Sequence, residues 1–222
     1  MRLYSSILLS FLLIATSASA QQKAKATCAC PANEFGVTQD QWQSSYRFSN
    51  GKELSIFGDK NNNYLSEFIL VDCLAGKTIE FWGAVETCTV KKMGDTLLIT
   101  ELTFLPNGVN NKYEPTDWLM HYYYYSNNTL QRSVAINRNI KRYTPQEIKT
   151  ILEDFDSRSG KYTVDVEPLM DKLWLATISG DKTARNYFEN FEKKFDWLDG
   201  AYSEQYHDLK AKLELWDNNQ IK

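Results

Sequence analysis

Three glutamates could carry acid–base chemistry: Glu80, Glu86 and Glu101 lie on or beside segments that otherwise resemble buried strands. Two carboxyl groups that face each other across a groove can hydrolyse a glycosidic bond, one as the acid and the other as the base or nucleophile. The solvent-facing side of a sheet carries carboxylates just as readily. The three glutamates therefore support only an alternative function, a carboxylate-based hydrolase of the cell envelope that could act on carbohydrate.

The other residue types give little support for catalysis. His121 and His207 are the only histidines, and each lies in a periodic aromatic segment, where a structural role is the more common one. The sequence contains no nucleophile-elbow, zinc-protease or phosphate-loop motif. A cysteine nucleophile would need a free thiol. We therefore predict no catalytic residue, no metal site and no cofactor.

Aromatic side chains offer a binding surface instead. Trp118, Tyr122 and Tyr124 share one face of a dense aromatic strand over residues 118–125. Such rings combine a large apolar area with a polar tip, which suits contact with a sugar or a protein, although the same rings could fill a core beneath helices. The leading hypothesis is an exported, non-catalytic binding or structural protein. Its partner would be an unknown protein or carbohydrate in the envelope or outside the cell.

Four cysteines, Cys28, Cys30, Cys73 and Cys88, predict disulfide bonds if the chain is exported, because an oxidising compartment favours them. With a turn at Gly83, Cys73 and Cys88 would lie two strand spacings apart, roughly 9–10 Å, beyond the ~7 Å that a disulfide spans. We therefore expect Cys28 and Cys30 to bridge to Cys73 and Cys88, one each, with the pairing open. The Cys-x-Cys spacing is not the usual one for zinc.

The N-terminus has the pattern of a secretory signal peptide. A basic residue is followed by an apolar run over residues 7–15 and by a small-residue cleavage site at residues 18–20. The mature chain is predicted to begin at Gln21, outside the cytoplasm, in the periplasm or beyond the cell. Residues 25–27 match a lipoprotein signal poorly, so lipid anchoring at Cys28 is not expected.

Charge and hydropathy exclude two classes of partner. The 222-residue chain has 25 basic and 28 acidic side chains, a formal net charge of −3. Nucleic acid requires a basic surface, so it is not a predicted partner. After the signal peptide no apolar run approaches the roughly 20 residues of a transmembrane helix, so no transmembrane segment is predicted.

Hairpins must position most of these residues. Residues 21–142 form a predicted antiparallel β region, with strands between about Trp42 and Asn137. Asn50-Gly51 and Asn127-Asn128 are predicted turns, because Gly and Asn tolerate the left-handed backbone that tight turns need. The segment 65–105 carries most of the strand signals between them, in a predicted meander.

The period of the apolar residues changes to that of a helix in the region 143–222. Thr144 to Glu147 match a capping box with proline at the first helical position. Gly180 and Asp181 are a predicted helix end and the next N-cap. We predict a bundle of about four helices, at least one covering the sheet, so the fold class is α+β. The expected helical core is Leu173, Trp174, Phe188, Phe191, Leu209 and Trp216.

Overall fold

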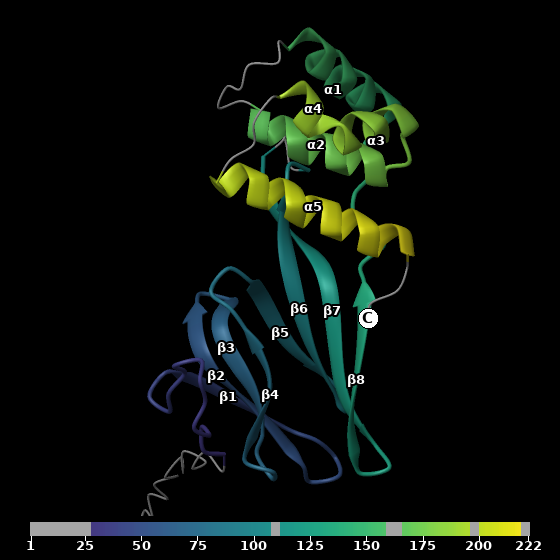
Figure 1. Ribbon diagram of the computed structural model, residues 1–222. Helices are drawn as coiled ribbons and strands as arrows, with labels where there is room; N and C mark the ends of the chain where they lie inside the picture. The colour runs from purple at the N-terminus through teal and green to yellow at the C-terminus, as the bar shows by residue number, and fades with distance from the viewer. Residues whose placement is uncertain (1–27, 108–111, 159–165, 196–199, 219–222) are drawn as a thin grey trace, which may run out of the picture.

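A computed structural model describes residues 28–107, 112–158, 166–195 and 200–218. The predicted signal peptide lies outside these residues. The described chain is α+β, as predicted, with an antiparallel sheet followed by helices (Figure 1). Its eight strands are β1 (Trp42–Arg47), β2 (Glu53–Asn61), β3 (Tyr64–Asp72), β4 (Lys77–Trp82), β5 (Thr87–Met93), β6 (Thr96–Leu105), β7 (Glu114–Ser126) and β8 (Thr129–Ile136).

Both predicted hairpin turns are confirmed. β1 and β2 pair across Asn50-Gly51, where Gly51 has a φ of +80°. β7 and β8 pair across Asn127 and Asn128, whose φ angles are 49° and 61°. These left-handed conformations explain why glycine and asparagine occupy the turns.

The sheet divides at β3. The second half of β3, from Phe68 to Asp72, pairs with β4, whereas Leu65 near its start pairs with Cys88 of β5. Gly83 lies in the short turn between β4 and β5. Figure 1 shows strands β1–β4 and strands β5–β8 as two parts of the sheet. Their inner sides bury one shared core, which we call the sheet core. It includes Leu54, Ile56, Phe68, Trp82, Ile99 and Tyr123.

Five helices follow among the described residues: α1 (Pro145–Ser157), α2 (Val166–Ile178), α3 (Lys182–Glu189), α4 (Phe191–Lys194) and α5 (Gly200–Asn218). The capping box is confirmed, since the Thr144 side chain accepts from the Glu147 backbone and the Glu147 side chain accepts from the Thr144 backbone. Asp181 caps α3 as predicted. The bundle has five helices rather than four because the predicted third helix breaks at Asn190, where φ is −107° and ψ is 16°.

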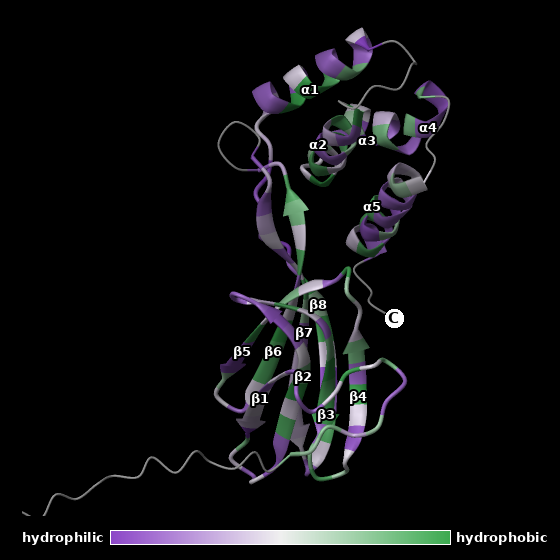
Figure 2. Ribbon diagram, turned by 90° about the vertical axis from the view of Figure 1, so that its left-hand side faces the viewer, coloured by the Kyte–Doolittle hydropathy of each residue, from purple (hydrophilic) through white to green (hydrophobic). Residues whose placement is uncertain are grey.

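The helices pack on the end of the sheet and not over one of its faces, contrary to expectation. They form their own core, to which the sheet contributes the buried Leu105, Trp118 and Ile136 and the partly buried Leu119, from the adjoining ends of β6, β7 and β8. Figures 1 and 2 show the helices as a separate layer beyond those strand ends. The large side chains of the sheet are instead buried between its own two halves.

The predicted helical core is correct for all but one of its residues. Five of the six expected side chains are buried: Leu173, Trp174, Phe188, Phe191 and Leu209. Trp216 is only partly buried, because it lies between the Trp118 ring and two cations. The guanidinium groups of Arg138 and Arg142 lie 4.3 and 4.6 Å from the centre of the Trp216 ring.

The N-terminal segment from Cys28 to Val37 packs on the outer face of β2 and β3. Cys28 and Val37 join Phe57, Ile69 and Val71 in a small apolar cluster. Alternate residues of a strand point to opposite faces, so this cluster lies across the sheet from the sheet core. A disulfide between Cys28 and Cys73 anchors the segment there, with a Cα–Cα distance of 4.9 Å.

The second expected disulfide is absent: Cys30 and Cys88 are free thiols. Cys30 lies beside the outer cluster, whereas Cys88 is fully buried in the sheet core on the opposite face. Cys73 and Cys88 are not separated by an intervening strand, as was expected, because β5 is a direct neighbour of β3. Cys88 pairs with Leu65, eight residues from Cys73 and so roughly 26 Å along β3.

Candidate functional site

The inner side of the sheet carries a chain of polar contacts that includes two of the three candidate glutamates. Glu80 on β4 accepts a hydrogen bond from Arg132 of β8 at 2.6 Å and another from the Tyr123 hydroxyl. The same Arg132 nitrogen lies 3.0 Å from His121 Nδ1, and His121 Nε2 lies 2.7 Å from Glu101 Oε1. The contacts link strands β4, β6, β7 and β8.

This chain of contacts fixes the tautomer of His121. A guanidinium can only donate, so Nδ1 of His121 must accept from Arg132 and carry no proton. The ring proton then sits on Nε2 and is donated to Glu101. Both ring nitrogens are thus engaged, and the His121 side chain is only 5% exposed. His121 therefore has no ring nitrogen free to exchange a proton with a substrate.

Glu101 is held in its ionised form. Burial acts to raise the pKa of Glu101, but hydrogen bonds from His121 and from the Trp82 indole, at 3.2 Å, lower it further than burial raises it. An ionised carboxylate can act as a base or attract a cation, but it cannot act as a general acid. Glu101 is also the residue that connects the polar chain to a cleft.

The cleft lies between the sheet and helix α5, and we call it the α5 cleft. Its volume is about 560 Å³. The sheet side contributes Val85, Glu86, Glu101, Leu102 and Trp118, and the helix side contributes Ala201, Glu204, Gln205, Asp208 and Lys212. Binding sites for small ligands commonly span about 300–1,000 Å³ and combine apolar walls with a few converging polar groups, as this one does.

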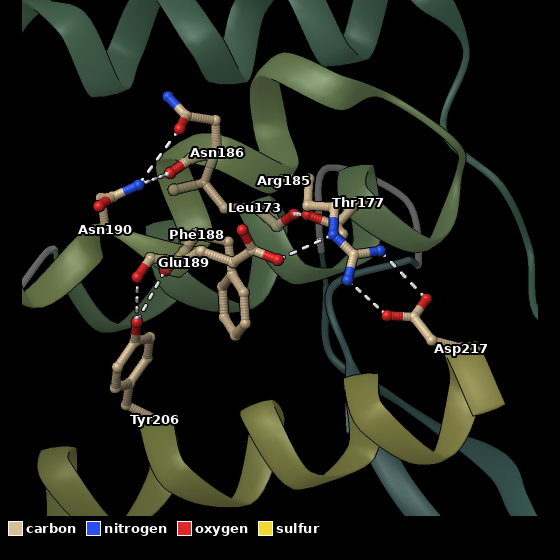
Figure 3. A network of polar contacts seen from close by, with 9 residues as sticks. All are labelled: Leu173, Thr177, Arg185, Asn186, Phe188, Glu189, Asn190, Tyr206 and Asp217. Atoms are coloured by element: carbon tan, nitrogen blue, oxygen red, sulfur yellow. Dashed lines mark hydrogen bonds and ion pairs between the residues drawn. The ribbon is translucent and has the colours of Figure 1, made fainter.

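Helix α5 is fixed at both ends by α3 (Figure 3). Near its start, the Tyr206 hydroxyl donates to the Phe188 and Glu189 carbonyls at 2.9 and 3.3 Å. Near its end, Asp217 accepts two hydrogen bonds from the Arg185 guanidinium, which also contacts Glu189 at 2.8 Å. A bidentate pair orients both partners. One wall of the α5 cleft is therefore held in place by the helical core.

A buried carboxylate lies behind this wall. Asp171 of α2, only 4% exposed, accepts from the Tyr113 hydroxyl at 2.6 Å and from Gln205 of α5 at 3.0 Å. Burial raises the pKa of Asp171 to about 6, and the nearby charge of Glu167 adds to the increase. The hydrogen bonds from Tyr113 and Gln205 lower the pKa of Asp171, but they offset only part of this increase. Asp171 thus links α2 to a residue that lines the cleft.

Replacing Asp171 by Asn is expected to stabilise the protein near pH 7 by up to about 3 kcal/mol. Because the pKa of Asp171 is raised in the folded state, the protonated form of Asp171 favours folding. This contribution to stability is fully present below the unfolded pKa of about 3.9. That stability is lost as the pH rises through about 6. Asparagine keeps an acceptor and gains a donor, so it can retain both contacts. Urea unfolding between pH 4 and 8 measures the effect. A difference between parent and variant that stays constant over this range would contradict the account.

The three predicted aromatic binding residues do not form one surface. β7 has one extra residue at Trp118, because Glu101 pairs with Leu119 while the next residue of β6, Leu102, pairs with Asp117. This bulge directs Trp118, 2% exposed, into the helical core. Tyr122 and Tyr124 remain on the outer face of the sheet, where Tyr124 is 37% exposed. A ligand at Tyr122 and Tyr124 remains a prediction.

The free thiols and His207 show no sign of activation. Burial raises the pKa of the Cys88 thiol strongly, and the charges of Glu101 and Glu86 raise it further. Burial also raises the pKa of Cys30. A raised pKa disfavours the reactive thiolate. His207 is exposed on α5, where its Nδ1 lies 2.6 Å from the Ser203 carbonyl. Neither thiol therefore has the environment of a nucleophile.

No cluster of three or more histidine, cysteine or acidic side chains in the described ranges could hold a metal ion. No described helix has both the length and the apolar composition needed to cross a membrane.

Comparison of the sequence and the structure with known proteins found no match. No family model fits the chain, and neither curated proteins nor solved structures resemble it. The site must therefore be interpreted from its own geometry.

Residues on the sheet side of the cleft could be identified from the sequence, but those on the helix side could not. Glu86, Glu101 and Trp118 were candidates, and the structure brings them to one cleft. Glu204 and Asp208 were missed, because acidic residues four apart on an amphipathic helix resemble an ordinary solvent-facing surface. Arg132 was missed as well. The alternation of residues along a strand does not show that β8 faces β4. That arrangement depends on how the whole sheet bends.

Proposed function

We propose that the protein is an exported, non-catalytic binding protein that holds its ligand in the α5 cleft. The observation that carries this proposal is the convergence of Trp118, Glu86 and Glu101 with the polar face of α5 around about 560 Å³. The cleft wall is rigidly supported, which reduces the entropy lost when a ligand binds. The disulfide between Cys28 and Cys73 is consistent with an oxidising compartment and supports export.

The chemistry of the cleft supports binding over catalysis. Hydrolysis by two carboxyl groups needs one that stays protonated near neutral pH. Asp171, whose pKa is raised by burial, lies behind Gln205 and does not line the cleft. Glu101 is ionised. Glu101 therefore cannot serve as the proton donor of such a carboxyl pair.

A matched pair of variants on α5 tests the proposal. Ala201→Trp places an indole in the cleft, whereas Ala211→Trp makes the same change at an exposed position of α5 that does not line it. We expect a ligand found by thermal-shift screening to raise the melting temperature of the parent and of Ala211→Trp by several degrees. The ligand should leave the melting temperature of Ala201→Trp unchanged. A ligand that stabilises both variants equally would contradict binding in the α5 cleft.

A carboxylate hydrolase remains a second candidate, favoured by one observation. Glu86 and Glu101 line the same cleft, and Glu101 is oriented by its hydrogen bond with His121. A broad hydrolase screen of the purified mature protein tests this function. Turnover that disappears in Glu101→Gln, a change that preserves the shape of the side chain, would favour the enzyme over the binding protein.

A further inference from the structure

We propose that the occupant of the α5 cleft is a basic, amphipathic segment of a partner polypeptide. This inference rests on the proposed function, because it names the ligand class of the same cleft. It is carried by two separate features of the lining residues, namely their charge and the exposed apolar surface at the edge of the cleft.

The charges that line the cleft are mostly negative. Four carboxylates face it, those of Glu86, Glu101, Glu204 and Asp208, against a single ammonium group, that of Lys212. The Lys212 ammonium is already paired with Asp208 at 2.5 Å. A concave site with walls of low dielectric constant concentrates the field of such charges. The α5 cleft therefore complements a ligand that carries more than one positive charge.

The lining also has an exposed apolar part. Val85 is 93% exposed, the highest value among the exposed large apolar side chains of the described residues, and it lines the cleft beside Leu102. A ligand that contacts the rim of the cleft would bury Val85 and add apolar burial to the electrostatic attraction. Lysine and arginine have apolar stems that lie along such surfaces while their charged ends reach carboxylates.

These two features favour a polypeptide over a small amine. A small polyamine could neutralise the carboxylates but would leave Val85 uncovered. A segment that alternates basic and apolar residues can place its charges against Glu86 and Glu204 and its apolar side chains against Val85 and Leu102. Charge complementarity of this kind mainly increases the association rate and the selectivity for basic partners.

A titration with a synthetic peptide tests the inference. The probe is a short peptide of alternating lysine and alanine, and its control has glutamate in place of lysine. We expect the basic peptide to bind the parent protein at low ionic strength, more weakly as salt is added, and the acidic peptide not to bind. The double variant Glu86→Gln with Glu204→Gln should weaken binding of the basic peptide by about tenfold or more.

The matched control removes the same number of negative charges at positions outside the cleft. Glu192→Gln with Glu214→Gln removes two exposed carboxylates that do not line the cleft, so it should weaken binding by no more than about twofold. Equal losses in the two double variants, or no loss in the first, would overturn the inference. If the basic peptide fails to bind while Ala201→Trp still abolishes binding of a screened ligand, the cleft is the binding site and only its charge assignment is wrong.

Discussion

Trp174→Ala is expected to lower the free energy of unfolding by about 3–5 kcal/mol, the usual cost of truncating a buried aromatic side chain. Trp174 is completely buried in the helical core, and its ring meets Trp118 of β7 edge to face at 5.6 Å. The substitution thus opens a cavity where the helices meet the sheet. Urea unfolding near neutral pH measures the loss, which is a large part of the stability of an ordinary domain.

Trp174→Phe provides the matched control. The Trp174 indole nitrogen is buried without a hydrogen-bond partner in the described residues, so phenylalanine removes an unsatisfied donor while keeping most of the ring volume. We expect this variant to lose roughly 1 kcal/mol or less. A Trp174→Ala variant as stable as the parent, or no more affected than Trp174→Phe, would contradict the packing of the helices on the sheet.

Removing the Cys28–Cys73 disulfide is expected to cost up to about 4 kcal/mol, measured as the loss of unfolding free energy in Cys28→Ser with Cys73→Ser. The bond joins residues 45 apart in sequence. Closing a loop of that length restricts the unfolded chain, which is the main source of stabilisation in the chain-entropy model. The loss should accompany release of residues 28–37 from the outer face of β2 and β3.

Cys30→Ser is the control for the disulfide, because Cys30 is a free thiol close to Cys28 in sequence. We expect this change to alter stability by less than about 1 kcal/mol. Non-reducing peptide mapping of the parent should recover the Cys28–Cys73 linkage. Recovery of a Cys30–Cys73 linkage, or an equal loss of stability in Cys30→Ser, would show that the cross-link is assigned wrongly.

Local features of the fold could be predicted from the sequence because they depend on short-range rules. The capping box from Thr144 to Glu147 and the turn at Asn50-Gly51 each place a particular residue type where the backbone requires it. The break at Asn190 was not predicted, because the apolar period continues across it from Phe188 to Phe191. Period alone does not show where a helix ends.

Long-range features could not be predicted in the same way. Whether Cys88 can reach Cys30 depends on which face of β5 is buried and on the pairing of β5 with β3. The sequence indicated a turn at Gly83, but it did not show which strand β5 pairs with after that turn, because this pairing depends on residues distant in sequence. The bulge at Trp118 could not be predicted either. One extra residue in β7 turns Trp118 away from the face that holds Tyr122 and Tyr124.

The candidate site was predictable in part for the same reason. Glu86 and Glu101 stood out because carboxylates interrupt segments that otherwise form a core. Glu204 and Asp208 lie more than 100 residues further along the chain and reach the same cleft only because α5 packs across the end of the sheet. To predict a site formed by the end of a sheet and a distant helix, one must know how the helix packs on the sheet. In this protein the helical core sets that packing.

The most direct test of the central claim is to map the bound ligand by backbone amide chemical shifts on the isotope-labelled mature protein. For a ligand found by thermal-shift screening, we expect the perturbed amides to cluster on residues 85–86, 101–102 and 201–212, the two walls of the α5 cleft. Amides near Tyr122 and Tyr124 on the outer face of the sheet should not move. Perturbations that cluster around Tyr122 and Tyr124, with none on α5, would contradict the assignment of the α5 cleft as the binding site.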